Sequence, residues 1–196
     1  MSARSITAVL VAAAFAAVAP YASAQAAADK KMDKPAGAMA QPKPAAEMSN
    51  LKFFDGSWSC SGDGAMEPGG PMMKMNSSVK SQSDLGGFWQ SGTVKGTTPG
   101  MPPFEGMFHM TWDAAARQYL MLWVDNMGAW SQTRASGWTG DKMVFSGEGQ
   151  MGDQKMAMRD TFTRKADGNL GHTGEMQVKG QWMKMMDETC RKSGSN

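Results

Sequence analysis

The sequence lacks the common catalytic motifs, and residues that often supply catalysis or metal binding are scarce. The 196 residues include two cysteines and two histidines. No Gly-x-Ser-x-Gly, His-Glu-x-x-His or glycine-rich phosphate loop is present, so the signatures of serine hydrolases, zinc peptidases and P-loop enzymes are missing. Asp160, Glu175, Asp187 and Glu188 are scattered along predicted strands, and we interpret them as solvated outer positions. The sequence therefore predicts a protein that is not an enzyme.

A surplus of charge is also absent from most of the chain. From Asn50 to Asn196 there are 15 Lys and Arg against 15 Asp and Glu. A nucleic-acid-binding domain needs a basic face, and this composition does not supply one. Beyond the N-terminal segment, no stretch resembles the roughly 20 apolar residues of a transmembrane helix. We expect no nucleic-acid partner and no transmembrane segment, and no feature indicates an oligomeric state.

The first 24 residues have the pattern of a secretory signal peptide. Arg4 supplies a positive charge, residues 6–18 form an apolar run too short to span a bilayer, and Ala22-Ser23-Ala24 is a small-residue cleavage site. We expect cleavage between Ala24 and Gln25. The mature protein is then periplasmic or secreted.

Residues 25–49 differ in composition from the rest of the chain. They are rich in Ala, Pro and Lys and contain no aromatic residue, so they bury too little surface to offset the entropy of the chain. A helix in the Ala-rich parts is the alternative, but Pro35, Pro42 and Pro44 limit its length. We interpret the segment as a disordered tether, which leaves residues 50–196 as one domain.

Apolar residues in this domain alternate over short stretches, as they do in β-strands. Phe108, Met110 and Trp112 share one face of a strand, and Met158 and Phe162 share a face of another. Turn signals separate about nine strands, near residues 56–64, 72–83, 88–96, 106–112, 118–125, 129–138, 142–150, 154–164 and 172–190, the last with a break expected at Gly180. The pattern predicts an all-β antiparallel fold, either a sandwich or an up-and-down barrel of about 8–10 strands.

The two cysteines lie near the two ends of the domain. Cys60 is in the first predicted strand and Cys190 in the last. In an oxidising compartment a disulfide between them is the simplest interpretation; two free thiols or a partial metal site are the alternatives. A barrel must pair its first and last strands to remove its edges. A Cys60–Cys190 bond fits that closure, although a sandwich could also bring the two residues together.

Several segments carry a resemblance to a known family. Gly56-Ser57-Trp58, within FFDGSWSC, resembles the Gly-x-Trp signature of lipocalin or calycin barrels. Together with GGFWQSGTVKG, PPFEGMFHMTWDAAARQYLMLWVDNMG and DETCRK, it is similar to an exported bacterial family of unknown function with a lipocalin-like barrel. The similarity covers residues 51–192. It implies the fold more than an activity, because one barrel hosts unrelated functions.

The resemblance also implies structural roles for particular residues. In calycin barrels the tryptophan after the first-strand glycine closes the barrel floor, and an arginine of the last strand packs over its ring as a cation. Here these residues would be Gly56, Trp58 and Arg191. The implied pairing conflicts with the disulfide, since Trp58 and Cys60 share a strand face whereas Cys190 and Arg191 do not. We give the disulfide precedence.

Haem is a further implication of the resemblance. Some related barrels hold haem through one histidine, so His109 and His172 would be the candidate ligands. The sequence has no C-x-x-C-H attachment motif. We interpret both histidines as exposed or hydrogen-bonded and expect no haem.

Methionine is the strongest anomaly of composition, with 21 residues. Six of them form Met-x-Met pairs that share a strand face: Met73 with Met75, Met156 with Met158, and Met183 with Met185. Soft thioethers select cuprous copper, which makes a periplasmic copper-binding protein one hypothesis. Flexible thioethers also line adaptable apolar interiors. The pairs are dispersed along the chain, and neither histidine is beside them.

The leading hypothesis is an exported barrel that binds a small apolar molecule and has no chemistry and no cofactor of its own. The residues expected to line its interior are Trp112, Met121, Trp123, Met143, Phe145 and Met158. Copper handling is the second hypothesis. The third is a structural or interaction module whose barrel is filled by its own side chains.

Overall fold

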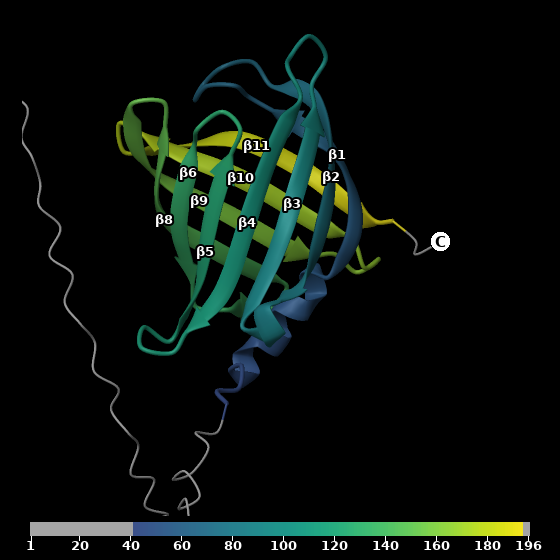
Figure 1. The fold of residues 1–196 in the computed structure, drawn as a ribbon. Coiled ribbons are helices and arrows are strands. Elements are labelled where there is room, and N and C mark those ends of the chain that lie inside the picture. The colour runs from purple at the N-terminus through teal and green to yellow at the C-terminus, as the bar shows by residue number, and fades with distance from the viewer. Residues whose placement is uncertain (1–40, 194–196) are drawn as a thin grey trace, which may run out of the picture. The chain divides into compact units, whose positions relative to one another are not determined.

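The structure, a computed structural model, describes residues 41–193, and most of its elements are β-strands (Figure 1). The predicted signal peptide and most of the predicted tether lie outside these residues. In chain order the elements are η1 (Ala46–Phe54), β1 (Gly56–Gly64), β2 (Met73–Asp84), η2 (Leu85–Gly87), β3 (Trp89–Thr97), β4 (Phe104–Asp113), β5 (Gln118–Asp125), β6 (Trp130–Ala135), β7 (Trp138–Thr139), β8 (Lys142–Met151), β9 (Gln154–Arg164), β10 (Leu170–Val178) and β11 (Gln181–Lys192). No helix within this part of the chain is long and apolar enough to cross a membrane.

The strands close into one antiparallel barrel. Strands β1 to β6 pair in sequence, β6 pairs with β8, β8 to β11 pair in sequence, and β11 pairs with β1. Strand β7 has two residues and pairs with β8. The predicted all-β barrel and the pairing of its first and last strands are confirmed.

The last predicted strand is a hairpin. It breaks after Val178, and β11 begins at Gln181. The two residues of the turn, Lys179 and Gly180, both have positive φ (50° and 81°), as a tight two-residue hairpin turn requires. The expected break at Gly180 is therefore a complete change of strand, and the barrel has ten strands besides β7.

A short 3₁₀ helix, η1, closes one end of the barrel (Figure 1). Its Leu51 and Phe54 are buried. The Trp58 indole N–H donates to the carbonyl of Phe54 over 3.0 Å, and the Tyr119 hydroxyl donates to the carbonyl of Glu47 over 2.9 Å. Composition suggested a domain boundary at position 50, but η1 begins four residues earlier, at Ala46. The contacts with the barrel order these additional residues. We call this the closed end.

The disulfide predicted between Cys60 and Cys190 is present. The two residues lie directly opposite each other in the register of β1 and β11. In the same register Trp58 lies opposite Lys192, whose Nζ is 5.1 Å from the centroid of the tryptophan ring. Arg191 lies opposite Ser59 and is exposed.

The role expected for Arg191 is therefore wrong. Lys192 supplies the cation over Trp58, and it shares a strand face with Cys190 because the two are separated by one residue. This removes the conflict between the cation and the disulfide. Gly56, at the start of β1, has a φ of 112°, a conformation that favours glycine.

Candidate functional site

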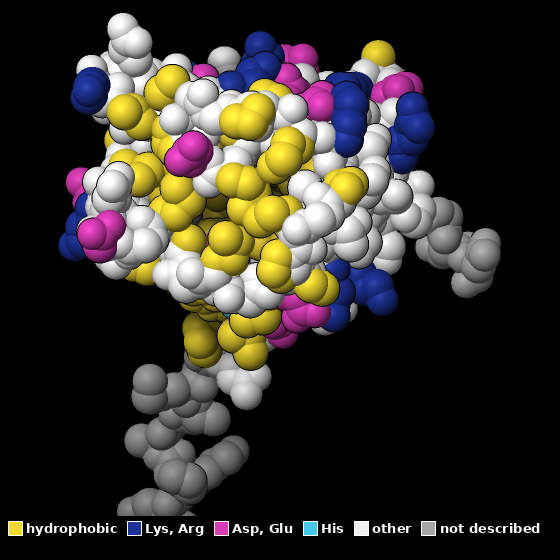
Figure 2. Space-filling model, turned by 90° about the horizontal axis from the view of Figure 1, so that it is seen from above, with side chains coloured by type: hydrophobic (Ala, Val, Ile, Leu, Met, Phe, Trp, Pro, Cys, Tyr) yellow, Lys and Arg dark blue, Asp and Glu magenta, His cyan; other side chains and the backbone are white. Residues whose placement is uncertain are grey.

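A cavity of about 640 Å³ occupies the barrel interior. Its walls come from β1–β6 and β8–β11, and residues of the loops at 65–72, 98–103 and 126–129 also line it. These loops lie at the end opposite η1 and form what we call the mouth. Seen from above in Figure 2, hydrophobic side chains surround a hollow. The volume is within the range of small-molecule sites.

Methionine dominates the lining. Twelve methionines contribute to it: Met66, Met73, Met75, Met101, Met110, Met121, Met127, Met151, Met158, Met176, Met185 and Met186. Aromatic side chains that include Phe54, Trp58, Phe108 and Trp123 complete the apolar walls. Unbranched thioethers adapt to ligands of different shape, so the walls suit a range of apolar molecules.

Two glycines explain why large aromatic residues leave the interior hollow. A Cβ at Gly92 would lie 2.2 Å from the Phe108 ring, and one at Gly106 would lie 2.4 Å from the Trp123 ring. Both rings therefore lie against the barrel wall, in space that any other residue would occupy. Trp123 is also fixed by a stacked Phe104 with ring centroids 6.1 Å apart.

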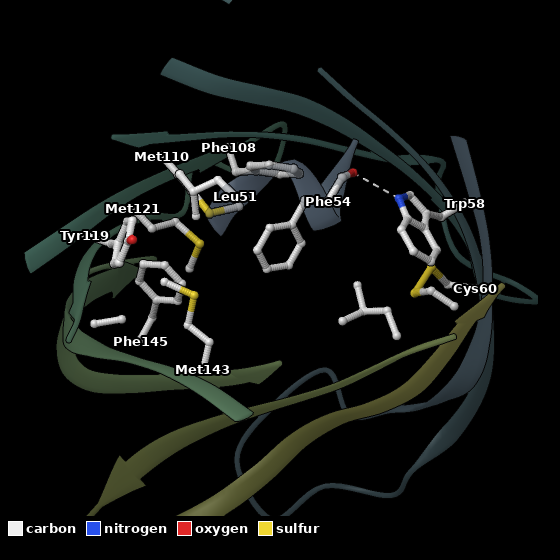
Figure 3. Packing of buried hydrophobic residues seen from close by; sticks show 13 residues of the cluster. Leu51, Phe54, Trp58, Cys60, Phe108, Met110, Tyr119, Met121, Met143 and Phe145 are labelled. Atoms are coloured by element: carbon white, nitrogen blue, oxygen red, sulfur yellow. Dashed lines mark hydrogen bonds between the residues drawn. A yellow bond between two sulfur atoms is a disulfide. The ribbon is translucent and has the colours of Figure 1, made fainter. Parts of the chain in front are cut away.

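The six residues expected to line the interior divide into two groups. Met121, Trp123 and Met158 line the cavity. Met143 and Phe145 are fully buried in the core, and Trp112 packs on Tyr119 with ring centroids 4.9 Å apart. Figure 3 shows Met143 and Phe145 beside Met121 and Tyr119. Met143, Phe145 and Trp112 therefore do not line the cavity, because they belong to the packing near the closed end.

The Met-x-Met pairs are divided in the same way. Met73, Met75, Met158 and Met185 line the cavity, whereas their partners Met156 and Met183 do not. Met183 packs toward the loop after β1, where a Cβ at Gly69 would lie 3.0 Å from its methyl carbon. Only the pair on β2 lines the cavity with both of its members.

A row of polar side chains crosses one wall of the cavity. The His172 Nε2 lies 3.0 Å from Asp160 Oδ1 and its Nδ1 lies 3.2 Å from Glu188 Oε1. The Ser77 hydroxyl donates to the other oxygen of Glu188 over 3.2 Å. We call Asp160, His172, Glu188 and Ser77 the ionic row. All four line the cavity.

The ionic row holds His172 as a cation. Burial by itself lowers the pKa of the imidazole, but hydrogen bonds to Asp160 and Glu188 and the charges of both carboxylates outweigh this and raise the pKa to about 9. The side chains of His172 and Glu188 are 14% and 6% exposed. Phe162 stacks under the imidazole, with ring centroids 4.6 Å apart. At neutral pH the row is therefore an imidazolium between two carboxylates.

The sequence interpretation missed this row. Asp160, Glu175 and Glu188 were expected at solvated outer positions, and this expectation is wrong because all three line the cavity. Strand alternation contained the signal for Asp160, because Asp160 lies between Met158 and Phe162 on one face. The partnership with His172 follows from register: His172 lies opposite Glu188 on β11 and opposite Phe162 on β9.

Neither histidine presents an unengaged ring nitrogen to the cavity. Both ring nitrogens of His172 are engaged by carboxylates. His109 is bound to the Ser91 hydroxyl over 2.9 Å and does not line the cavity. Cys60, Cys190 and Glu188 lie close enough to share an ion, but both sulfurs belong to the disulfide. The expectation of no haem stays a prediction.

Comparison with known proteins supports the fold and identifies the family. No curated protein matches the sequence. Among solved structures, the crystal structure of Rv2717c from M. tuberculosis is similar, with a TM-score of 0.60 and 15% sequence identity, over 78% of this chain and 100% of that one. A family described as "Protein of unknown function (DUF1579)" matches residues 43–192. The chain, with its lipocalin-like barrel, belongs to this DUF1579 family.

Proposed function

We propose that this protein is an exported, non-catalytic binding protein that takes a small, mostly apolar molecule into the barrel. The observation that carries the proposal is the cavity of about 640 Å³, open at the mouth, with methionine and aromatic side chains forming much of its lining. Such a site binds by removing apolar ligand surface from water. A hollow interior also argues against a barrel filled by its own side chains.

The ionic row supports a role without chemistry. A general base needs a free nitrogen or oxygen within reach of the proton that it removes. Both nitrogens of His172 are held by carboxylates, and the Ser77 hydroxyl is directed to Glu188. The Ser77 hydroxyl is bound to a carboxylate and not to the imidazole, so these residues form no Ser–His pair. The disulfide is compatible with export, since such bonds persist in oxidising compartments.

A larger side chain in the cavity wall should weaken binding. Val94 lines the cavity, and we expect Val94→Trp to weaken the binding of Nile red, a neutral apolar dye, by at least about tenfold, roughly 1.4 kcal/mol. The matched control is Val144→Trp, because Val144 is 40% exposed on β8. Dye emission measures binding, and circular dichroism checks that both variants fold. Equal dye affinity in the two variants would contradict the proposal.

Copper handling is the second candidate, favoured by the twelve methionines of the lining. If these thioethers serve packing and apolar contact, changing Met183 and Met185 to Leu should alter the free energy of unfolding by less than ~1.5 kcal/mol per site. Cuprous-ion binding should be absent before and after the change. Denaturant unfolding and anaerobic Cu(I) titration measure the two quantities. Tight stoichiometric Cu(I) binding that disappears in the double variant would favour copper handling.

A further inference from the structure

The cavity walls carry negative charge without a basic counterpart other than histidine. Among the described residues that line it, the acidic ones are Asp125, Asp160, Glu175 and Glu188, the one imidazole is His172, and none is Lys or Arg. Ligand carboxylates in a low-dielectric site need a cation to compensate their loss of hydration. This lining gives a ligand carboxylate no free cation.

Most of these charges are accounted for by neighbouring groups. Glu175 forms an ion pair with Arg159 over 2.7 Å. Asp125, at the end of β5 near the mouth, accepts backbone N–H bonds from Met127 and Ala129 and is paired with no Lys or Arg among the described residues. In the ionic row one imidazolium stands between two carboxylates, so the row retains one negative charge. Asp125 and the row therefore leave the cavity negative at its mouth and on its wall.

Asp160 has the acceptor best placed to meet a ligand. Its Oδ1 is bound to His172, and its other carboxylate oxygen has no hydrogen-bond partner among the residues that the structure describes. Its side chain is 23% exposed, against 14% for His172 and 6% for Glu188. Asp160 therefore presents an unused, negatively charged oxygen at a surface that lines the cavity.

We infer that the cavity selects apolar molecules that carry a cationic group, such as a hydrophobic amine, with the cation placed against Asp160. This inference rests on the proposed binding function and adds the charge of the ligand. A protonated amine would donate to the free oxygen of Asp160 and neutralise the excess charge of the ionic row. The ring of Trp123, which also lines the cavity, attracts cations over its face. A carboxylate at the same place would meet charge of its own sign.

The test compares three probes with the same apolar chain and different head groups. Dodecylamine, dodecanol and dodecanoate each compete with Nile red for the full chain at pH 7. We expect the amine to bind at least about tenfold more tightly than the alcohol, equal to about 1.4 kcal/mol, and the carboxylate to bind more weakly than the alcohol. Equal affinities, or preference for the carboxylate, would overturn the inference.

A charge variant assigns the preference to Asp160. Asp160→Asn keeps a carbonyl oxygen that can accept from His172 and removes the charge, so it should reduce the affinity for dodecylamine by about tenfold and leave that for dodecanol within about twofold. The matched control is Asp141→Asn, at an exposed position that does not line the cavity. This control should leave the affinities for all three probes unchanged. Undiminished amine binding by folded Asp160→Asn would overturn the placement of the cation.

The outcomes separate the inference from the proposed function. If Nile red and dodecanol bind but the amine has no advantage, the selection of a cation fails and the apolar binding function stands. If neither the dye nor any of the three probes binds to the folded protein, both fail. Circular dichroism of each variant ensures that loss of binding is not loss of fold.

Discussion

Replacing Cys60 and Cys190 together with alanine should lower the free energy of unfolding by about 5 kcal/mol, from the loop-closure entropy of a bond that spans 130 residues. The bond joins the first and last strands of the barrel, so nearly the whole domain lies within the loop that it closes. Alanine is the suitable replacement because both cysteines are buried, at 1% and 2% exposure, and serine would bury a hydroxyl group.

Guanidinium unfolding of the oxidised protein, the reduced protein and the double variant measures this effect. The reduced protein and the variant should unfold at similar denaturant concentrations, both well below the oxidised protein. A reductant should not change the unfolding of the variant. A loss of stability below about 1 kcal/mol would mean that the hydrogen bonds of β1 and β11 hold the closure without the covalent bond.

The barrel could be predicted from the sequence because its determinants are local or few. Alternation identified strand faces, turn residues separated the strands, and two cysteines in the terminal strands indicated closure. Alternation also gave the correct face to Met121 and Met143. It could not separate them, because only Met121 lines the cavity while Met143 lies in the packed core.

That difference depends on depth along the barrel. Helix η1 fills the closed end with Leu51 and Phe54, and its first residues lie in a segment whose composition resembles a tether. The order of η1 comes from tertiary contacts such as the bond between Tyr119 and Glu47, which are not visible in local sequence. The cavity therefore begins where η1 ends, and no local feature of the sequence marks that point.

The ionic row was missed for a different reason. Acidic residues are mostly exposed in proteins, and this tendency conflicts with the alternation that places Asp160 on the face of Met158 and Phe162. The meeting of His172 with Glu188 also depends on the register of β10 and β11, which contains an irregularity between Gly174 and Glu175. Register across a bulge is set by the folded sheet and not by the spacing of residues in the chain.

Substituting His172 with glutamine should have the second large effect, a loss of about 3 kcal/mol of stability at pH 7. The variant leaves the carboxylates of Asp160 and Glu188 in the cavity wall without their cation, and removing one partner of a buried ionic group is strongly destabilising. Glutamine retains hydrogen-bonding capacity, so the loss reports mainly the missing charge. Denaturant unfolding at pH 7 measures it.

The same substitution should also remove a pH dependence from the protein. The pKa of His172 is raised in the folded state from its ordinary value of 6.5 to about 9. The folded protein therefore binds this proton more tightly than the unfolded chain does. The resulting stability is fully present below pH 6.5 and is lost as the pH rises through 9. At most about 3 kcal/mol should disappear across this window, at 1.36 kcal/mol for each pKa unit.

Unfolding free energies measured from about pH 6 to about pH 10, a range that brackets the pKa values of 6.5 and about 9, should fall in the wild type and stay nearly constant in His172→Gln. The matched control is His109→Gln, since His109 is bound to the Ser91 hydroxyl and not to a carboxylate. This control should retain the wild-type decline. The same decline in both variants would show that the ionic row does not hold His172 as a cation, whereas its loss in His172→Gln alone would assign the pH dependence to the wall of the cavity.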